Sequence, residues 1–467
     1  MKAFTEPLLS LAGFEEMTKT AEKSSGLISV TGCIDAQKSQ MIYAFGGHRK
    51  NKLIVTFGEQ KARELYDEYS FFDKEVVYYP SKDVLFYQSD IRGNLLTAER
   101  IRALKAIREQ ERVTLVTTFD ALMNTMAPIE KMWENVLTLE QGQLLDLKEI
   151  QAALIRMGYE KEYQVQTMGQ FSVRGGILDV FPLTEENPIR IELWGDEIDT
   201  IRYFDCESQK SIENTDRVSI YPAAELVLSD EEKAGGIDKL KAEAKRVSDK
   251  LRKQMKTEEA HRVTVMADEL TEEWGELSMY AGMDAFLSYF FDERVGLLDY
   301  FKPSDSLIFF DELTRCTEQG KLTETEFSES MKQRLAMGYI LSGQMNGLFT
   351  EKEIVAKLGK YSCIALAALD NKANGLHQLG SYGIHCQSVS PYNNSFELLI
   401  KDLKRYKKNG YRVILLSGSR TRAKRLSEDI TDQGITCFYT ENYDHELFEG
   451  QIMVCYGKVR RGFEYPI

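Results

Sequence analysis

Short apolar runs alternate with amphipathic stretches through the first part of the chain. Val- and Ile-rich runs predict buried strands, and apolar residues at helical spacing between them predict helices. Strands and helices that alternate in this way form a parallel sheet built of βαβ units. The predicted strands are residues 27–30, 52–57, 75–80 and 113–118, and the predicted helices begin near residue 37 and cover residues 58–69 and 95–110.

The pattern changes in the middle of the chain, where short alternating runs are punctuated by turn residues. Such runs predict a small, mostly β insert. Within it, residues 188–205 predict a hairpin that turns at the Gly-Asp pair 195–196. Successive strand residues point to opposite faces, so we expect Arg190, Glu192 and Trp194 on one face and the apolar residues between them on the other.

A highly charged helical stretch follows over residues 230–262, and an α/β pattern then returns. The stretch 305–315 predicts an apolar strand that leads straight into Asp311 and Glu312. Further along, the predictions are a helix at 395–410, a strand at 411–418, a helix at 419–434 and strands at 435–440 and 451–457. The last residues come directly after a strand, and we expect the chain to be a piece of a longer protein.

The N-terminal segment, the lengths of the apolar runs and the cysteines indicate where in the cell the protein is located. Residues 1–17 carry acids within an apolar pattern and predict an amphipathic helix rather than a signal peptide. No apolar run approaches the ~20 residues that span a bilayer. Seven scattered cysteines without a C-x-x-C pair favour a reducing cytoplasm and argue against structural zinc.

The net charge and its distribution indicate which kinds of partner the protein can bind. The net charge of −14 argues against an autonomous DNA-binding protein, because such a surface repels the phosphate backbone. Basic runs nevertheless gather near the end of the chain, at 401–412, 419–425 and 458–461. Solvated helix faces are the favoured interpretation of these runs, and a weak nucleic-acid or acidic-partner surface is the alternative.

The stretch from Gly32 to Ser39 is one residue away from a phosphate-binding loop. The pattern G-x-x-x-x-G-K-[ST] needs a strand end, a turn of backbone N–H groups, a lysine for the outer phosphates and a hydroxyl for Mg²⁺. Gly32, Lys38 and Ser39 fit this pattern, whereas Gln37 stands where the second glycine is required.

Asp311 and Glu312 are the matching half of such a site, since a partner strand supplies the acid that holds the Mg²⁺ ion. The two halves predict an α/β fold with a degenerate RecA-like, P-loop NTPase-like parallel-sheet core. Gln37 argues against activity, because a left-handed non-glycine residue costs about 1–2 kcal/mol. Asp35 would also place a carboxylate toward the triphosphate. We therefore expect a retained fold without a working nucleotide site, and no metal or cofactor.

Arg174, Arg190 and Trp194 form a second candidate site in the β insert. Arginine and tryptophan dominate protein–protein hot spots, although periodicity alone favours a solvent face with an incidental aromatic residue. A catalytic site is not predicted. The five histidines lie outside any G-x-S-x-G, H-E-x-x-H or Cys/His arrangement, and the Ser-rich stretch 417–420 is typical of a helix N-cap.

The β insert resembles the second domain of the bacterial transcription-repair coupling factors (Mfd), a domain that the excision-repair protein UvrB shares. The most specific part lies in 171–209, with FSVRGGILDVFP followed by IRIELWGDEIDTIRYFDCESQ. Residues 86–107, SLIFFDE at 306–312 and YRVILLSGSRTRAKRLSEDI at 411–430 are also similar to this family. The resemblance covers essentially the whole chain.

The resemblance implies a UvrB-like core with an inserted domain and a small C-terminal α/β domain. The implied pieces are domain 1A (1–135), domain 2 (136–222), domain 1B (223–385) and domain 3 (386–467). Domain 2 is implied to recruit UvrA, with Arg174, Arg190 and Trp194 at the positions that carry that contact. The resemblance further implies a cytoplasmic DNA-repair adaptor. The ATP- and Mg²⁺-dependent motor and the contacts with RNA polymerase and DNA would lie in other parts of the full-length protein, and we expect this chain to be a monomer.

Two departures separate the chain from UvrB itself. Gln37 breaks the intact loop of that ATPase, and the segment between the strand at 75–80 and the helix at 95 is too short for its damage-probing hairpin. The rival hypothesis is an active UvrB-like or helicase-like ATPase that binds ATP between domains 1A and 1B. An open cleft around Lys38 would favour that enzyme, whereas pairing of Lys38 with Asp35, Asp311 or Glu312 would favour the adaptor.

Overall fold

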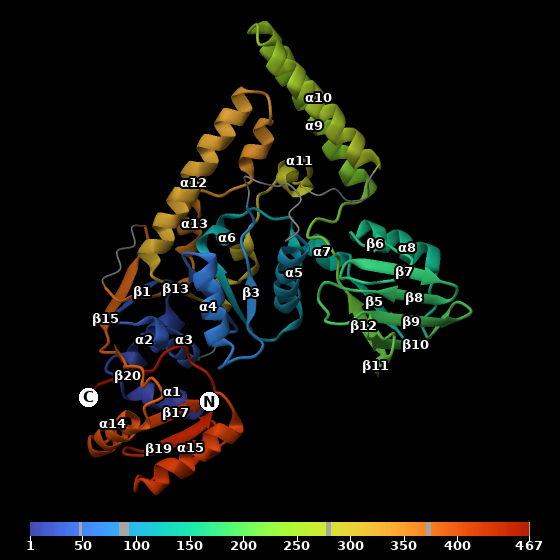
Figure 1. Ribbon diagram of the computed structural model, residues 1–467. Helices are drawn as coiled ribbons and strands as arrows, with labels where there is room; N and C mark the ends of the chain where they lie inside the picture. The colour runs from blue at the N-terminus through green and yellow to red at the C-terminus, as the bar shows by residue number, and fades with distance from the viewer. Residues whose placement is uncertain (46–48, 84–92, 277–281, 370–374, 467) are drawn as a thin grey trace.

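The computed structural model describes residues 1–45, 49–83, 93–276, 282–369 and 375–466 (Figure 1). Its centre is a seven-stranded sheet with the order β15-β1-β14-β13-β2-β4-β3. Every neighbouring pair in this sheet is parallel, which confirms the predicted α/β core. The strands are β1 (Gly26–Thr31), β2 (Asn51–Thr56), β3 (Val77–Tyr79), β4 (Val113–Thr118), β13 (Ser306–Asp311), β14 (Ser362–Leu366) and β15 (Gln378–Gly383).

Both faces of this sheet are covered, which is why its strands read as continuous apolar runs. In β13, for example, Phe309 and Phe310 belong to separate hydrophobic clusters on the two sides of the sheet. The surrounding helices are α2 (Phe14–Lys23), α3 (Asp35–Ala44), α4 (Glu59–Tyr69), α5 (Gly93–Glu109), α6 (Phe119–Met123), α7 (Ile129–Glu134), α12 (Leu313–Ala336) and α13 (Glu351–Leu358), with 3-10 turns η3 (Leu297–Tyr300), η4 (Pro303–Asp305) and η5 (Ser342–Asn346).

Domain 2 contains a mixed, mostly antiparallel six-stranded sheet with the order β11-β10-β9-β8-β7-β6. Its apolar face packs with α8 (Leu147–Arg156) and with the two-stranded pair β5 (Leu137–Glu140) and β12 (Arg217–Ile220). The strands are β6 (Glu160–Lys161), β7 (Gln170–Arg174), β8 (Ile177–Val180), β9 (Ile189–Trp194), β10 (Glu197–Phe204) and β11 (Ser211–Thr215). The predicted hairpin and its two faces are confirmed, with Ile191 fully buried and Trp194 exposed.

The charged stretch after domain 2 forms a long antiparallel helical hairpin of α9 (Asp230–Lys253) and α10 (Thr257–Glu276), which projects from the molecule (Figure 1). The foot of the hairpin packs on η2 (Met283–Phe286) and α11 (Leu287–Phe290). Domain 3 has a parallel sheet of order β17-β19-β18. Its elements are α14 (Phe396–Lys408), β17 (Val413–Ser417), α15 (Arg420–Asp432), β18 (Phe438–Tyr439) and β19 (Ile452–Tyr456), beside the pair β16 (Gln387–Ser388) and β20 (Phe463–Glu464).

Two sequence-based boundaries are wrong. The N-terminal helix is divided into α1 (Lys2–Thr5), η1 (Glu6–Ser10) and α2, and the break before α2 falls at Gly13, which adopts a left-handed conformation with φ of 81°. Helix α3 begins at Asp35, two residues before the predicted start. The domain divisions stay predictions, and the predicted lack of a hairpin before residue 95 lies largely outside the described residues. Within the described ranges, every helix is too short or too polar to cross a bilayer.

A buried charge network joins the chain leaving domain 2 to the central sheet. Arg100 Nε lies 2.9 Å from Glu225 Oε1. Lys82 contacts the same carboxylate, and its Nζ also lies 2.5 Å from Asp284 Oδ2. Burial alone would raise the pKa of Glu225, but the charges of Arg100 and Lys82 lower it to about 2. The charged form of Glu225 is therefore favoured more strongly in the folded protein than in the unfolded chain and persists to a lower pH.

This network predicts acid sensitivity. A depressed carboxyl pKa contributes stability above the unfolded value and loses it as the pH falls toward the folded value. The shift from 4.5 to about 2 corresponds to a contribution on the order of 3 kcal/mol. Glu225→Gln should flatten the fall in unfolding free energy between about pH 5 and 3 in denaturant titrations. Glu231→Gln, an exposed acid on α9, should not change that slope, and equal slopes for both variants would contradict the role of Glu225.

Candidate functional site

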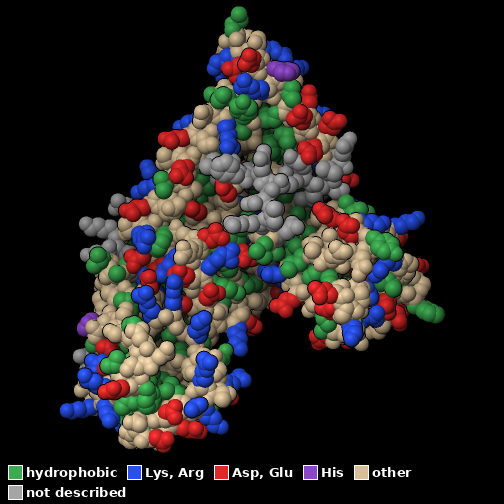
Figure 2. Space-filling view, in the orientation of Figure 1, with side chains coloured by type: hydrophobic (Ala, Val, Ile, Leu, Met, Phe, Trp, Pro, Cys, Tyr) green, Lys and Arg blue, Asp and Glu red, His purple; other side chains and the backbone are tan. Residues whose placement is uncertain are grey.

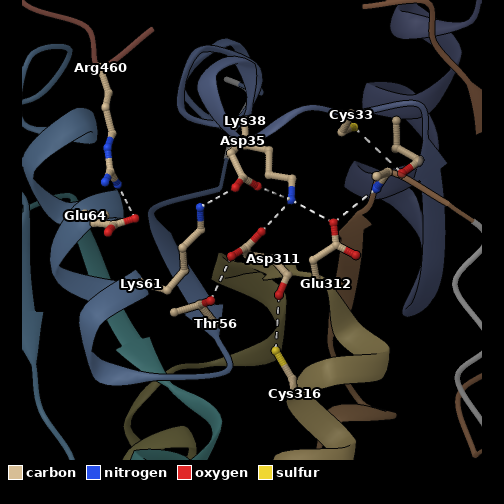
Figure 3. A network of polar contacts seen from close by, with 12 residues as sticks. Cys33, Asp35, Lys38, Thr56, Lys61, Glu64, Asp311, Glu312, Cys316 and Arg460 are labelled. Carbon is tan, nitrogen blue, oxygen red and sulfur yellow. Dashed lines mark hydrogen bonds and ion pairs between the residues drawn. The ribbon is translucent and has the colours of Figure 1, made fainter. Parts of the chain in front are cut away.

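The predicted loop and the predicted acids meet at one edge of the central sheet. Strand β1 ends at Thr31 and β13 ends at Asp311, with β14 between them. Because all three strands are parallel, their carboxyl ends lie together, and α3 brings Lys38 over Asp311 and Glu312 (Figure 3). The two halves recognised in the sequence therefore form one cluster.

The connection from β1 to α3 is too short and too well paired to act as an open phosphate cradle. Only residues 32–34 separate the strand from the helix. The N–H of Gly32 donates to the carbonyl of Ala368 at 3.2 Å, and the N–H of Cys33 donates to Ala367 at 3.0 Å. A phosphate loop presents such N–H groups to the ligand, whereas here neighbouring backbone accepts their hydrogen bonds.

Gly32 is required by packing rather than by a ligand. Its φ is 79°, a conformation that favours glycine. A β-carbon at this position would also lie 2.0 Å from the carbonyl oxygen of Ile384, on the chain after β15. The first glycine of the motif is thus explained by the close approach of two backbone segments.

Lys38 is enclosed by carboxylates. Its Nζ lies 2.5 Å from Asp311 Oδ1, 3.0 Å from Glu312 Oε1 and 3.2 Å from Asp35 Oδ1 (Figure 3). The lysine side chain is only 1% exposed. All three hydrogens of the ammonium can be donated to these acids, so the group that would hold outer phosphates is already occupied.

The acids have further partners that fix the cluster. Thr56 Oγ1 donates to Asp311 Oδ2 at 2.8 Å, and the N–H of Ala368 donates to Glu312 Oε1 at 3.1 Å. Glu312 itself adopts a left-handed conformation with φ of 56°. A strained residue of this kind persists only where its surroundings hold it, and Lys38 and Ala368 supply those contacts.

The electrostatics of the cluster favour the charged lysine. Burial alone would lower the pKa of Lys38, but the charges and hydrogen bonds of Asp311 and Glu312 raise it above its ordinary value. Burial would likewise raise the pKa of Asp35, yet its contacts with Lys61 and Lys38 lower it. Each charge is thus stabilised by a protein partner.

The other two motif positions point into the protein. Gln37 is fully buried and its Nε2 lies 3.6 Å from Met41 Sδ, one turn along α3. The Ser39 hydroxyl is also buried, and among the described residues it has no hydrogen-bond partner. We infer that neither side chain faces an anion site in this conformation.

The second candidate site, on the polar face of domain 2, is built around a buried acid. Asp179 is 1% exposed, and Arg190 binds it bidentately at 2.7 and 2.8 Å. Arg174 Nη2 approaches the same carboxylate at 3.1 Å. Arg190 also donates to Gln209 Oε1 at 2.8 Å and stacks over Phe204, 4.2 Å from its ring centroid. The two predicted arginines therefore lie together but are not free.

Trp194 differs from the arginines in its exposure. It ends β9 at the tip of the hairpin, on the same face as Arg190, with 84% of its surface exposed. A large exposed aromatic side chain is costly to leave in water and is typical of a binding anchor. An open groove beside it is lined by residues that include Glu140, Glu197 and Asp216.

Some residues that hold the side chains of the two candidate sites in place were not predicted from the sequence. Asp179 lies directly opposite Arg190 in the strand pairing, a juxtaposition that needs the register of β8 and β9. Thr56 and Lys61 reach the first cluster from β2 and α4 and belong to no motif. The only available signal for Asp179 was its charge within an otherwise apolar strand, ILDV.

Comparison with known proteins bears directly on domain 2. Residues 137–226 match the family model described as UvrB interaction domain. The match spans β5 to β12, together with the chain that carries Glu225 into the buried network.

Similarity to whole proteins extends over most of the chain. It is 26% identical to the transcription-repair-coupling factor of Bacillus subtilis over 89% of this chain and 35% of that protein. The corresponding factors of Staphylococcus haemolyticus and Staphylococcus aureus are 26% and 25% identical over 94% and 97% of this chain. The chain spans little more than a third of the length of these curated relatives. These findings confirm the predicted resemblance to a UvrB-like module of coupling factors.

The cluster around Lys38 predicts that replacing this lysine strongly lowers the free energy of unfolding. Lys38→Met would leave Asp311 buried without its partner, and we expect a loss of about 3–5 kcal/mol in unfolding free energy. Lys61→Met is the matched control, since among the described residues Lys61 forms its ion pair with the exposed Asp35, and its loss should cost under about 1 kcal/mol. Denaturant titration of both variants checks this difference, and equal losses would contradict the enclosure of Lys38.

The domain 2 cluster predicts coupling between Arg190 and Asp179. Arg190→Ala should destabilise the protein by about 3 kcal/mol, because it strips the main partner from a buried carboxylate. Asp179→Asn in the same chain should recover part of that loss. The check is a double-mutant cycle by chemical denaturation, and strictly additive losses would show that the two residues do not act together.

Proposed function

We propose that this chain is the UvrB-homology adaptor module of a transcription-repair coupling factor. In this role it recruits UvrA to stalled RNA polymerase for transcription-coupled nucleotide excision repair. The observation that carries the proposal is the match of residues 137–226 to the UvrB interaction domain, on the same residues that fold as the β unit with Trp194 at its tip. Similarity to coupling factors over about nine-tenths of the chain supports the wider role.

Within domain 2 we assign unequal roles to the three predicted contact residues. Trp194 is the apolar anchor, because its ring is exposed and unoccupied by the described parts of the chain. Arg174 supplies a charge-assisted contact, since its side chain is 36% exposed and makes one bond to Asp179. Arg190, at 12% exposure, chiefly holds Asp179 and the strands around it.

For the core we propose a retained RecA-like architecture that neither binds nor hydrolyses ATP. Support comes from the enclosure of Lys38 by three acids and from the pairing of the loop N–H groups with Ala367 and Ala368. ATP, Mg²⁺, DNA and RNA polymerase would then engage other parts of the full-length coupling factor. This module would act in the cytoplasm as a monomer, without a cofactor or metal of its own.

The direct test is binding of this chain to purified UvrA. Trp194→Ala should weaken the affinity more than about tenfold, as hot-spot truncations do. Tyr163→Ala is the matched control, because Tyr163 is similarly exposed at 82% but follows β6, an edge strand three places from β9 in the sheet. Calorimetry gives both affinities, and circular dichroism checks that each variant is folded. Unchanged UvrA affinity in Trp194→Ala would overturn the assignment.

A further inference from the structure

Helix α1 lies between the core and domain 3 (Figure 1). Both of its apolar side chains, Ala3 and Phe4, are buried. They belong to a hydrophobic cluster whose other members come from the chain beside α1, from the turn after α4 and from domain 3. These members are Met1, Phe71, Phe72, Ile414, Leu416, Phe438, Tyr443, Leu447, Met453 and Cys455. Three segments that are distant in the sequence therefore share one apolar interior.

Phe4 joins the core side of this cluster to the domain 3 side. Its ring centroid lies 5.4 Å from that of Phe71 and 5.8 Å from that of Phe72, and both contacts are edge-on. On the other side it lies 6.0 Å from the ring centroid of Tyr443. Aromatic pairs in such geometries add to the stabilisation that burial alone provides. Phe4 therefore forms an apolar bridge between the core and domain 3.

Hydrogen bonds fix α1 to both of its neighbours. The N–H of Ala3 donates to the carbonyl of Tyr443 at 3.0 Å, and Gln40 Nε2, on α3, donates to the carbonyl of Phe4 at 2.6 Å. The hydroxyl of Tyr465, just after β20, donates to Gln40 Oε1 at 3.1 Å. Gln40 is only 8% exposed, and both ends of its amide are used. Gln40 therefore connects α3 to α1 and to domain 3.

Domain 3 also contacts α4 and the turn after it directly, at a place that requires glycine. A β-carbon on Gly457 would lie 2.4 Å from Phe71 Cε2 and 3.0 Å from Leu416 Cδ2. The φ of Gly457 is outside the left-handed region, so the requirement comes from the close approach of Phe71. Three residues further along, Arg460 forms an ion pair with Glu64 on α4. Domain 3 and the core are therefore closely packed on either side of α1.

This contact differs from the usual contact between domains. Domains of one chain normally move relative to one another unless their interface is extensive and hydrophobic. Here, separation of domain 3 from the core would expose the aromatic rings around Phe4 to water, which is unfavourable. In Figure 2 the surface runs from the core into domain 3 without a hollow on the face shown, whereas domain 2 stands apart from domain 3. The apolar contact forms without a ligand.

We propose that residues 2–5, the N-terminal clasp, hold domain 3 in one fixed orientation on the core. The clasp fills the space between the turn after α4 and domain 3, and Gln40 sets its position relative to α3. The orientation is therefore built into the fold and does not depend on a ligand at the edge of the central sheet near Lys38. The core and domain 3 act as one rigid body. The inference does not rest on the proposed UvrA contact of domain 2.

Single-molecule fluorescence energy transfer on this chain tests the clasp. Dyes on azide-bearing side chains at the exposed positions 60 and 428 report the distance between α4 and α15. The unsubstituted chain should give one narrow population. Phe4→Ala should increase the population outside it by at least about tenfold, because this variant removes the apolar bridge. Gly457→Val should act in the same way from the domain 3 side, since its added carbons collide with Phe71.

Control variants separate movement of domain 3 from a general loss of stability. Leu9→Ala, at a residue of η1 that is 63% exposed, should leave the narrow population unchanged. Phe14→Ala removes a buried ring that packs on Phe45 within the core, and it should lower the melting temperature without broadening the population. Circular dichroism checks that each variant is folded. Because Phe4→Ala and Gly457→Val change opposite sides of the contact, one of them suffices if the other does not fold.

The proposal is overturned if the folded Phe4→Ala and Gly457→Val variants keep the narrow population, or if Phe14→Ala broadens it as much as they do. It is also overturned if Mg-ATP shifts the population of the unsubstituted chain, because a ligand would then set the orientation. Trp194→Ala should not alter this population whatever its effect on UvrA binding, so the clasp and the proposed function can fail independently.

Discussion

The contact between Lys38 and Asp311 is the interaction on which the arrangement of the core depends. It joins α3 to the end of β13 across β14, in a place where water does not reach the ammonium. A buried charge without a partner costs several kcal/mol, so neither residue is tolerated there alone. Glu312 and Thr56 complete the enclosure, and the left-handed conformation of Glu312 is held by the same contacts. Under the proposed function, this ion pair occupies the place that a nucleotide would need.

The backbone just after β1 is likewise contacted by other parts of the protein. Gly32 adopts a left-handed conformation that favours glycine, and the carbonyl oxygen of Ile384 lies close to it. The N–H groups of Gly32 and Cys33 donate to the carbonyls of Ala368 and Ala367. In domain 2, the bidentate pairing of Arg190 with Asp179 joins the neighbouring strands β8 and β9, and Trp194 ends β9.

Much of the fold could be predicted from local sequence patterns. The contacts within the candidate sites could not, because they depend on how distant segments align. The strands of the core and the hairpin at 195–196 were evident because their periodicity is set by the chain itself. The break at Gly13 and the early start of α3 were not, since both depend on contacts with distant segments such as Tyr382 and Ala368. The Lys38 motif indicated which residues would meet, but only the geometry distinguishes an open site from an occupied one. Asp179 lay outside every motif.

Nucleotide binding measured directly on this chain tests the central claim. In isothermal titration with Mg-ATP, or equilibrium dialysis with labelled ATP, the enclosure of Lys38 predicts no saturable binding and no rise in melting temperature. Binding that stabilises the protein and disappears in Lys38→Ala would mean that the cluster opens to admit a triphosphate. That result would contradict the account of the core as architecture and restore an ATPase-like site between the strands that end at Thr31 and Asp311.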